Sequence, residues 1–198
     1  MVDELLHRLR HYRPRHLETD RTHPEAAVLL PIIRGDDPEL VLTLRASNLS
    51  THGGEVALPG GRRDPEDPDL IHTALREAYE EIGLPPGLVE VVGPLSPLIS
   101  YYGIKVTPYV GIIPDYVEYT PNDAEIAAVF TVPLSFLCEV PPEVTPRIDE
   151  QGRRSYIPSY QYGEYRIWGL TAAIIVELVN LLYDVGISLH EPPHSVEK

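Results

Sequence analysis

The sequence predicts a single α/β domain in which helices pack on a β-sheet. Three observations favour this class. Strand-like runs flank an amphipathic helix expected at residues 68–82, and a second, apolar helix is expected at residues 170–183. The chain has 198 residues, of which 43% are apolar, and this is enough for one domain to bury a core of its own.

The first part of the chain predicts an arm followed by a β-hairpin. Residues 3–12 have the pattern of a short helix, and residues 1–24 are expected to form an arm over the main domain at 25–186. Buried strands are expected at 25–34 and 40–44, joined by a turn from Gly35 to Pro38. A further short strand is expected at 55–58.

The helix at 68–82 has the most clearly marked ends in the chain. Asp67 suits the N-cap, and Pro68 suits the first helical position, where its missing N–H costs nothing. Gly83 suits a left-handed C-cap. Apolar residues recur at helical spacing and predict one face that packs on a sheet; they are Leu70, Ile71, Ala74, Leu75, Ala78 and Ile82.

The remainder of the chain predicts more strands and a closing helix. The strands are expected at 88–92, 95–101, 104–113, 126–132, 143–147 and, in pieces, 154–168. The apolar helix at 170–183 closes the domain, and residues 187–198 are expected to be a disordered tail.

The charge and composition exclude several kinds of partner. A net charge of −14 disfavours binding to nucleic acid, which depends on Lys and Arg displacing counterions from phosphates. The sequence has no run of about eighteen apolar residues, which a membrane span requires, and no recognisable secretory signal at its start. The single cysteine, Cys138, leaves no intramolecular disulfide. We therefore expect a cytoplasmic protein with neither a nucleic acid nor a membrane as partner.

Three carboxylates crowd one side of the helix at 68–82. Glu77, Glu80 and Glu81 lie at spacings of three and four, opposite the apolar face. Like charges at such spacings cost a helix about 0.2–0.5 kcal/mol each, and the negative end of the helix dipole adds to the conflict. Arg76 can neutralise only part of this charge. A divalent cation would remove the conflict, so the pattern indicates a site for Mg²⁺ or Mn²⁺.

The same carboxylates also fit an ordinary solvated helix face, because Glu-rich exposed faces are common. Gly60 and Gly61, at the end of the preceding strand, favour the metal site, since glycine lets the backbone approach a ligand closely. A Gly-Gly pair taken alone also fits a plain turn.

Taken together, these residues resemble the Nudix box, a loop–helix–loop motif that binds metal and positions a diphosphate for hydrolysis. The resemblance rests on Gly60, Gly61, Glu77, Glu80, Glu81, Gly83 and Leu84. The loop is one residue longer than the common form and carries Glu66-Asp67 where a single glutamate is usual, which leaves the loop acid undecided. The resemblance implies the Nudix-type α/β/α sandwich with a mixed β-sheet.

The residues upstream of the box are similar to those of the coenzyme A pyrophosphatase subgroup. That similarity rests on Leu42-Thr43-Leu44-Arg45, Leu49, His52, Gly54, Val56 and Pro59-Gly60-Gly61, and segments 102–111 and 167–172 also look like this subgroup. The chain departs from it at Ala46, Glu55 and Leu58. The resemblance implies hydrolysis of coenzyme A or acyl-CoA to 4′-phosphopantetheine, or its acyl form, and adenosine 3′,5′-bisphosphate.

The resemblance also implies roles for particular residues. Metal ligands would be Glu77, Glu80, Glu81 and the carbonyl of Gly61, with Glu80 either a ligand or the partner of Arg76. The general base stays open between these three glutamates and Glu125, for which a plain loop carboxylate is an equal alternative.

A substrate with several negative charges needs local cations or N–H donors in so acidic a chain. The candidates are Arg45, His52, Gly60, Arg62, Arg63 and Lys105, although a solvated role suits each cation taken singly. Two other functions remain: a Nudix hydrolase of ADP-ribose or NADH, and a catalytically silent module that senses a nucleotide. A homodimer is a possible assembly, in which the Arg residues at positions 8, 10, 13, 15 and 21 would be structural or form a subunit contact.

Overall fold

The computed structural model describes residues 2–17, 22–49, 52–148 and 154–189. Its centre is a mixed sheet of eight strands in the described part of the chain, with the order β3-β2-β1-β7-β5. Strand β4 pairs with β1, β6 with β7 and β8 with β2. The strands are β1 (Glu25–Ile33), β2 (Glu39–Arg45), β3 (Val56–Ala57), β4 (Gly60–Arg62), β5 (Glu90–Pro94), β6 (Leu98–Ile99), β7 (Lys105–Ile113) and β8 (Ile126–Pro133).

The long pairing of β1 with β7 is parallel, whereas the other pairings in this sheet are antiparallel. The expected hairpin of β1 and β2 is confirmed, but these strands pair only near the turn, at Ile32–Leu40 and Ile33–Glu39. Beyond that point β3 pairs with β2 and β4 pairs with β1. The double glycine of β4 is therefore built into the sheet beside β1.

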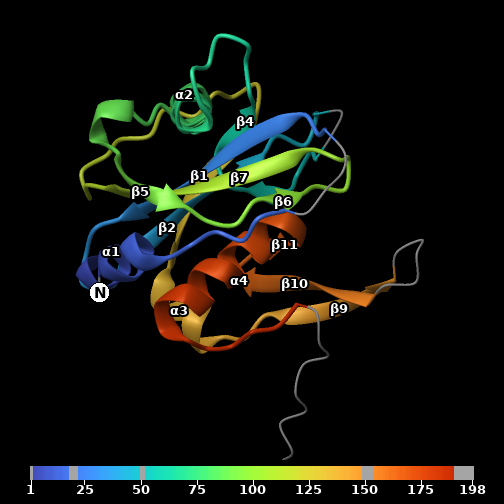
Figure 1. The fold of residues 1–198 in the computed structure, drawn as a ribbon. Coiled ribbons are helices and arrows are strands. Elements are labelled where there is room, and N and C mark those ends of the chain that lie inside the picture. The colour runs from blue at the N-terminus through green and yellow to red at the C-terminus, as the bar shows by residue number, and fades with distance from the viewer. Residues whose placement is uncertain (1, 18–21, 50–51, 149–153, 190–198) are drawn as a thin grey trace, which may run out of the picture.

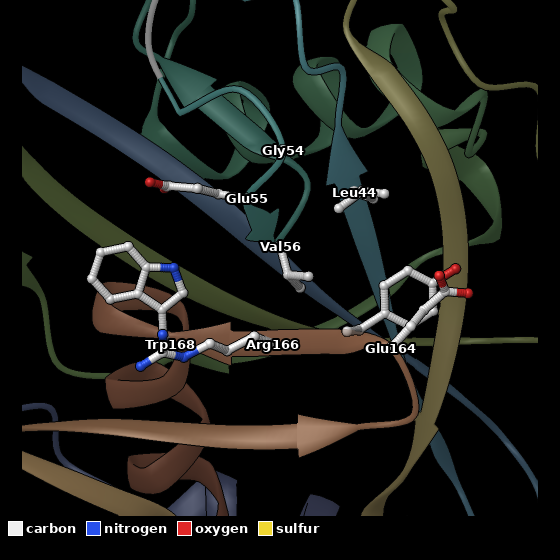
Figure 2. Close-up of a pocket in the computed structure, with 8 residues that line it drawn as sticks. Leu44, Gly54, Glu55, Val56, Glu164, Arg166 and Trp168 are labelled. Carbon is white, nitrogen blue, oxygen red and sulfur yellow. The ribbon is translucent and has the colours of Figure 1, made fainter.

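A second, antiparallel sheet projects from the body of the molecule (Figure 1). Its order is β11-β10-β9, formed by β9 (Glu143–Ile148), β10 (Arg154–Tyr162) and β11 (Tyr165–Trp168). The sequence predicts these strands but not their separation from the main sheet. Strand β11 lies across a pocket from β3, and Figure 2 shows Arg166 and Trp168 facing Glu55 and Val56 there.

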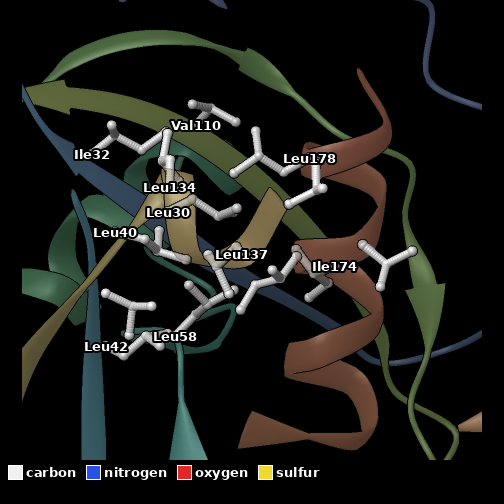
Figure 3. Packing of buried hydrophobic residues seen from close by; sticks show 14 of the residues in the cluster. Leu30, Ile32, Leu40, Leu42, Leu58, Val110, Leu134, Leu137, Ile174 and Leu178 are labelled. Carbon is white, nitrogen blue, oxygen red and sulfur yellow. The ribbon is translucent and has the colours of Figure 1, made fainter. Parts of the chain in front are cut away.

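Helices cover both faces of the main sheet, which confirms the α/β/α sandwich. One face carries α2 (Leu70–Ile82), and the other carries α1 (Val2–His11), α3 (Leu134–Glu139) and α4 (Gly169–Tyr183). Successive residues of β1 serve the two layers in turn, because side chains alternate along a strand: Leu29 packs with α2 and Leu30 with α4. Figure 3 shows the larger of the two cores, between the sheet and α4.

The start of α2 differs from the expectation. The helix begins at Leu70, and its N-cap is Asp69, whose carboxylate accepts a hydrogen bond from the N–H of His72. Asp67 is not the cap, because its carboxylate is bound to Arg76 and Thr73. The expected C-cap is confirmed at Gly83, whose φ of 69° is left-handed. Helix α3 and strand β4 have no counterpart among the predicted elements.

The described part of the arm lies against α4. Helix α1 packs its buried Leu9 into the larger core. Tyr12 follows it, and its hydroxyl donates to Glu177 of α4 and hydrogen-bonds with Ser96 at 2.8 Å. In the part of the chain that the structure describes, no helix has the length and apolar character needed to cross a bilayer.

The C-terminal end departs from the expected tail at its beginning. The main-chain N–H and carbonyl of Ile187 bond with the side chain of Asn180, each at 2.8 Å. The carbonyl of Leu189 accepts from the N–H of Tyr156 at 3.0 Å. Residues 187–189 are thus held by α4 and β10, and the rest of the predicted tail, 190–198, lies outside the described residues.

Candidate active site

Two glutamates of α2 meet the double glycine of β4. The backbone N–H of Gly60 donates to Oε2 of Glu81 at 3.0 Å. The carboxylate of Glu77 lies so close to Gly61 that a Cβ added there would be 2.4 Å from its Cδ. Gly60 has a φ of +155°, and an added Cβ would be 2.4 Å from the carbonyl oxygen of Ala27. Gly60 therefore needs glycine for its backbone to fit beside β1, and the absence of a side chain at Gly61 lets the Glu77 carboxylate reach the strand.

Glu81 is the buried acid of the site. Its exposed fraction is 3%, and Arg45 approaches its carboxylate with Nη1 at 3.4 Å from Oε1. Burial raises the pKa of Glu81 to about 7, against the opposing effects of the Gly60 N–H and Arg45. The charges of Glu77 and Glu125 raise this pKa further. A carboxylate with such a pKa can hold or release a proton near neutral pH.

Glu77 is half-buried beside it. Burial raises the pKa of Glu77, and the adjacent Arg76 opposes the shift. Nη1 of Arg76 lies 2.9 Å from Oε1 of Glu77 and 3.1 Å from Oε2 of Glu80. Glu80 itself is exposed, with 55% of its side chain accessible. The three glutamates are therefore unequal: Glu77 and Glu81 face the strand, and Glu80 faces solvent with Arg76 as its partner.

Arg76 neutralises more of the acid cluster than its sequence position indicates. Besides Glu77 and Glu80, its guanidinium binds both oxygens of Asp67, at 3.0 Å through Nε and 2.9 Å through Nη2. The carbonyl of Arg62 accepts from the same Nη2 at 3.1 Å. The planar guanidinium of Arg76 thus offsets part of the repulsion between the glutamates that their spacing predicts.

Asp67, and not Glu66, is the loop acid that supports the helix. Asp67 is buried and also accepts hydrogen bonds from Thr73 Oγ1 at 2.9 Å and the Asp64 N–H at 3.0 Å. The bound Arg76 guanidinium holds the pKa of the Asp67 carboxyl well below its usual range. Glu66 is exposed. The local sequence pattern leaves this choice open, because Asp67 and Arg76 are nine residues apart.

Glu125 lies within electrostatic reach of the site. Its charge raises the pKa of both Glu77 and Glu81. Its segment is fixed on two sides, because the Asn122 N–H donates to the carbonyl of Glu81 at 2.9 Å and the Ala46 N–H donates to the carbonyl of Glu125 at 2.7 Å. The turn that carries Glu125 therefore joins the end of α2 to the end of β2.

The predicted cationic residues have different surroundings. Arg45 contacts Glu81 directly. Arg63 and Lys105 both pair with Glu25, at 3.0 and 3.5 Å, and His52 pairs with Glu55 at 2.7 Å. Arg62 is exposed and makes no ion pair within the described residues. Of the predicted cations that the structure describes, Arg45 is the one in contact with a glutamate of α2.

The donor set fits a hard divalent cation. Within residues 2–17, 22–49, 52–148 and 154–189, no group of three or more His, Cys, Asp or Glu side chains is already arranged around one ion position. The acids are instead held by Arg45 and Arg76. Glu77 and Glu81 nevertheless place their carboxylates beside the two glycines of β4. Oxygen is the donor atom that Mg²⁺ and Mn²⁺ prefer.

The sandwich, with a helix that holds clustered glutamates against a double glycine, has the features that the resemblance to the Nudix box predicts. The NUDIX domain model matches residues 22–156, more than half of the chain, and this chain accordingly belongs to the Nudix family. It is a Nudix hydrolase of pyrophosphate bonds.

The relatives agree with this assignment over most of the chain. The Nudix hydrolase NudL of Enterobacter sp. (strain 638) is 42% identical over 177 residues, which cover 89% of this chain and 92% of that protein. NudL of Shigella sonnei (strain Ss046) is 42% identical over 178 residues, 90% of this chain and 93% of that protein.

Solved structures agree in fold. The MutT/nudix family protein from Enterococcus faecalis has a TM-score of 0.55 at 15% identity, covering 92% of this chain and 74% of that one. The NUDIX hydrolase from Alicyclobacillus acidocaldarius has a TM-score of 0.50 at 18% identity, covering 88% and 100%. At these identities the likeness concerns the fold alone.

Proposed function

We propose that this enzyme hydrolyses the diphosphate bond of coenzyme A or an acyl-CoA, giving 4′-phosphopantetheine or its acyl form and adenosine 3′,5′-bisphosphate. The observation that carries the proposal is the place of the upstream motif. Arg45, which the motif contributes, contacts Glu81, and Gly60, where the motif ends, donates to the same carboxylate. Two residues of the segment similar to the coenzyme A subgroup thus contact Glu81, the most buried acid of the Nudix box.

In this proposal Glu77 and Glu81 hold Mg²⁺ or Mn²⁺, with the Gly61 carbonyl and Glu80 as further donors. The cation, when bound, neutralises charge on the phosphoryl oxygens and makes a water molecule more acidic. Arg76 orients Glu77 from the side, because Asp67 fixes its guanidinium. Arg45 then offers its charge to the diphosphate at the edge of the site.

The proton acceptor is proposed among Glu77, Glu80, Glu81 and Glu125. Glu77, Glu80 and Glu81 would act on a water molecule that the cation orients, from positions in which they also hold that cation. Glu125 suits the task because its charge acts on both Glu77 and Glu81, and it has no arginine partner among the described residues.

The remaining binding residues stay proposals. Arg62 has a guanidinium free of ion pairs in the described part of the chain, so it can meet a phosphate without breaking one. Arg63, Lys105 and His52 would first exchange a carboxylate partner. The Gly60 N–H would have to be shared with Glu81. A cytoplasmic location and a homodimer also stay predictions.

A product assay tests the proposal. The purified chain with excess Mg²⁺ or Mn²⁺ is given coenzyme A, acetyl-CoA, ADP-ribose and NADH in parallel, and products are separated by chromatography. We expect adenosine 3′,5′-bisphosphate from coenzyme A at a rate well above the rate on ADP-ribose. Faster cleavage of ADP-ribose or NADH would transfer the proposal to that substrate, and binding without turnover would favour the sensing module.

A further inference from the structure

A pocket of about 290 Å³ lies between the main sheet and the second sheet. Its volume is at the lower end of the range of about 300–1,000 Å³ for small-molecule sites, so it suits one part of a substrate. Its lining comes from Leu44 near the end of β2, from the segment 54–56 that leads into β3, and from the turn residue Glu164 with strand β11 (Figure 2).

The wall formed by β11 presents an aromatic and a cationic side chain. Arg166 and Trp168 point to the same face of this strand, and Ile167 between them is buried. The indole of Trp168 is 42% exposed, and the Arg166 guanidinium carbon lies 5.9 Å from its ring centroid. In the described residues Arg166 has no carboxylate partner within ion-pair distance. An exposed indole beside an unpaired guanidinium is a surface on which a planar heterocycle can stack.

The opposite wall joins this pocket to the catalytic side. Leu44 lines the pocket, and the next residue, Arg45, reaches Glu81. The Gly54 N–H donates to the carbonyl of Arg45 at 3.1 Å, and the Arg45 N–H donates to the carbonyl of Glu55 at 3.0 Å. The end of β2 thus carries a pocket residue on the α4 face of the sheet and, on the opposite face, a residue that contacts the acidic site. A ligand that occupies both places would have to pass around the end of β2.

We infer that this pocket binds the adenine base of the diphosphate substrate, with Trp168 as the stacking surface. The inference rests on the proposed function, since it assigns a place to one part of that substrate. The polar lining favours an aminopurine over the alternatives. Glu55 and Glu164 can accept from an amino group, and these two carboxylates outnumber the one arginine, so the net negative charge of the lining disfavours a phosphate. An acyl chain in the pocket would remove water from Glu55, Glu164 and Arg166 and would offer them no hydrogen bonds in return, which is unfavourable.

The chain offers a direct probe, because Trp168 is its one tryptophan. Its fluorescence is measured while adenosine 3′,5′-bisphosphate, 4′-phosphopantetheine or inorganic phosphate is added. Titration of N-acetyltryptophanamide corrects for light absorbed by the base. We expect saturable quenching by adenosine 3′,5′-bisphosphate and none by the other two. Quenching by 4′-phosphopantetheine without quenching by the adenine compound would overturn the assignment.

Kinetics separate this inference from the proposed function. Trp168→Leu should raise KM for coenzyme A about tenfold, the size of a lost stacking contact, with little change in kcat. Trp168→Phe should keep KM within about twofold, because it retains an aromatic face. Tyr116→Leu is the matched control, since Tyr116 is 70% exposed and lies outside the pocket. An unchanged KM in Trp168→Leu would overturn the assignment.

The two proposals fail in different ways. Hydrolysis of coenzyme A without quenching by adenosine 3′,5′-bisphosphate would overturn the base pocket and leave the hydrolase supported. Saturable quenching without hydrolysis of coenzyme A would overturn the proposed function and support the pocket for a different adenine nucleotide.

Discussion

The N–H of Gly60 donates a hydrogen bond of 3.0 Å to the carboxylate of Glu81. This bond links the glycine end of β4 to the buried acid of α2. The hydrogen bond stabilises the charged form of Glu81, while burial favours the neutral form. Together these two effects give Glu81 a pKa of about 7, and the strand beside it has no side chain at Gly60 or Gly61. Gly61, the next residue, gives Glu77 the same access.

The two glycines should respond differently to the same substitution. In Gly61→Ala the three atoms nearest to the new methyl would be those of the Glu77 carboxylate, which is the end of a flexible side chain. We expect this variant to fold, with its free energy of unfolding within about 1 kcal/mol of the parent, and to lose at least about 100-fold in kcat as Glu77 is displaced.

Gly60→Ala is the contrasting case. Its methyl would lie 2.4 Å from the Ala27 carbonyl oxygen and 2.5 Å from the Val28 Cα, and backbone cannot swing aside. We expect a loss of about 3 kcal/mol or more in the free energy of unfolding, measured by denaturant titration. Full activity in Gly61→Ala would contradict the proposed role of Glu77.

Glu81→Gln should abolish turnover and change the pH dependence of stability. Because the pKa of Glu81 is about 7 in the fold and 4.5 ordinarily, the native state binds a proton that the unfolded state has lost between these values. The stability of the metal-free parent therefore falls as pH rises through this window. The variant lacks this loss and should be more stable than the parent by about 1–3 kcal/mol near pH 8.

Near pH 4 the parent carboxyl is neutral and resembles the amide, so the two proteins should then unfold alike. Thermal unfolding in a chelator at both pH values checks this expectation. A stability difference of the same size at both would show that packing, and not ionisation, distinguishes the variants.

Much of this site could be predicted from sequence, because its signals are local. The spacing of Glu77, Glu80 and Glu81 placed them on one helix, and Gly83 marked the end of that helix. Spacing could not rank them, since their difference arises from contact with β4, which pairs with a strand far away in the chain. The exposure of Glu80 and the burial of Glu81 are tertiary effects.

The cap of α2 shows the same limit. Asp67 and Asp69 are both good N-cap residues by type, and Pro68 favoured the earlier one. The structure uses Asp69 because Asp67 has a stronger partner in Arg76. The pocket beside Trp168 could not be predicted from local sequence patterns either, because β3 and β11 meet there from distant parts of the chain.

Asp67→Asn should weaken both the fold and the catalyst. It removes the charge that binds Arg76 through two hydrogen bonds, in a buried position, and we expect a loss of about 2–3 kcal/mol in the free energy of unfolding. Activity should fall as well, because Arg76 would no longer be held beside Glu77. Glu66→Gln, one residue earlier and exposed, is the matched control and should stay within about 0.5 kcal/mol of the parent.

Tyr12→Phe tests whether the N-terminal arm is part of the folded unit. The Tyr12 hydroxyl donates to Glu177 and hydrogen-bonds with Ser96, and burial raises its pKa to about 12. Its removal should lower the free energy of unfolding by about 1–2 kcal/mol and speed hydrogen exchange in α1. Activity should stay unchanged, because α1 packs on the face of the sheet opposite α2. Tyr116→Phe, at a 70% exposed position, should change neither quantity, and equal effects of the two variants would mean that the arm is not anchored through this hydroxyl.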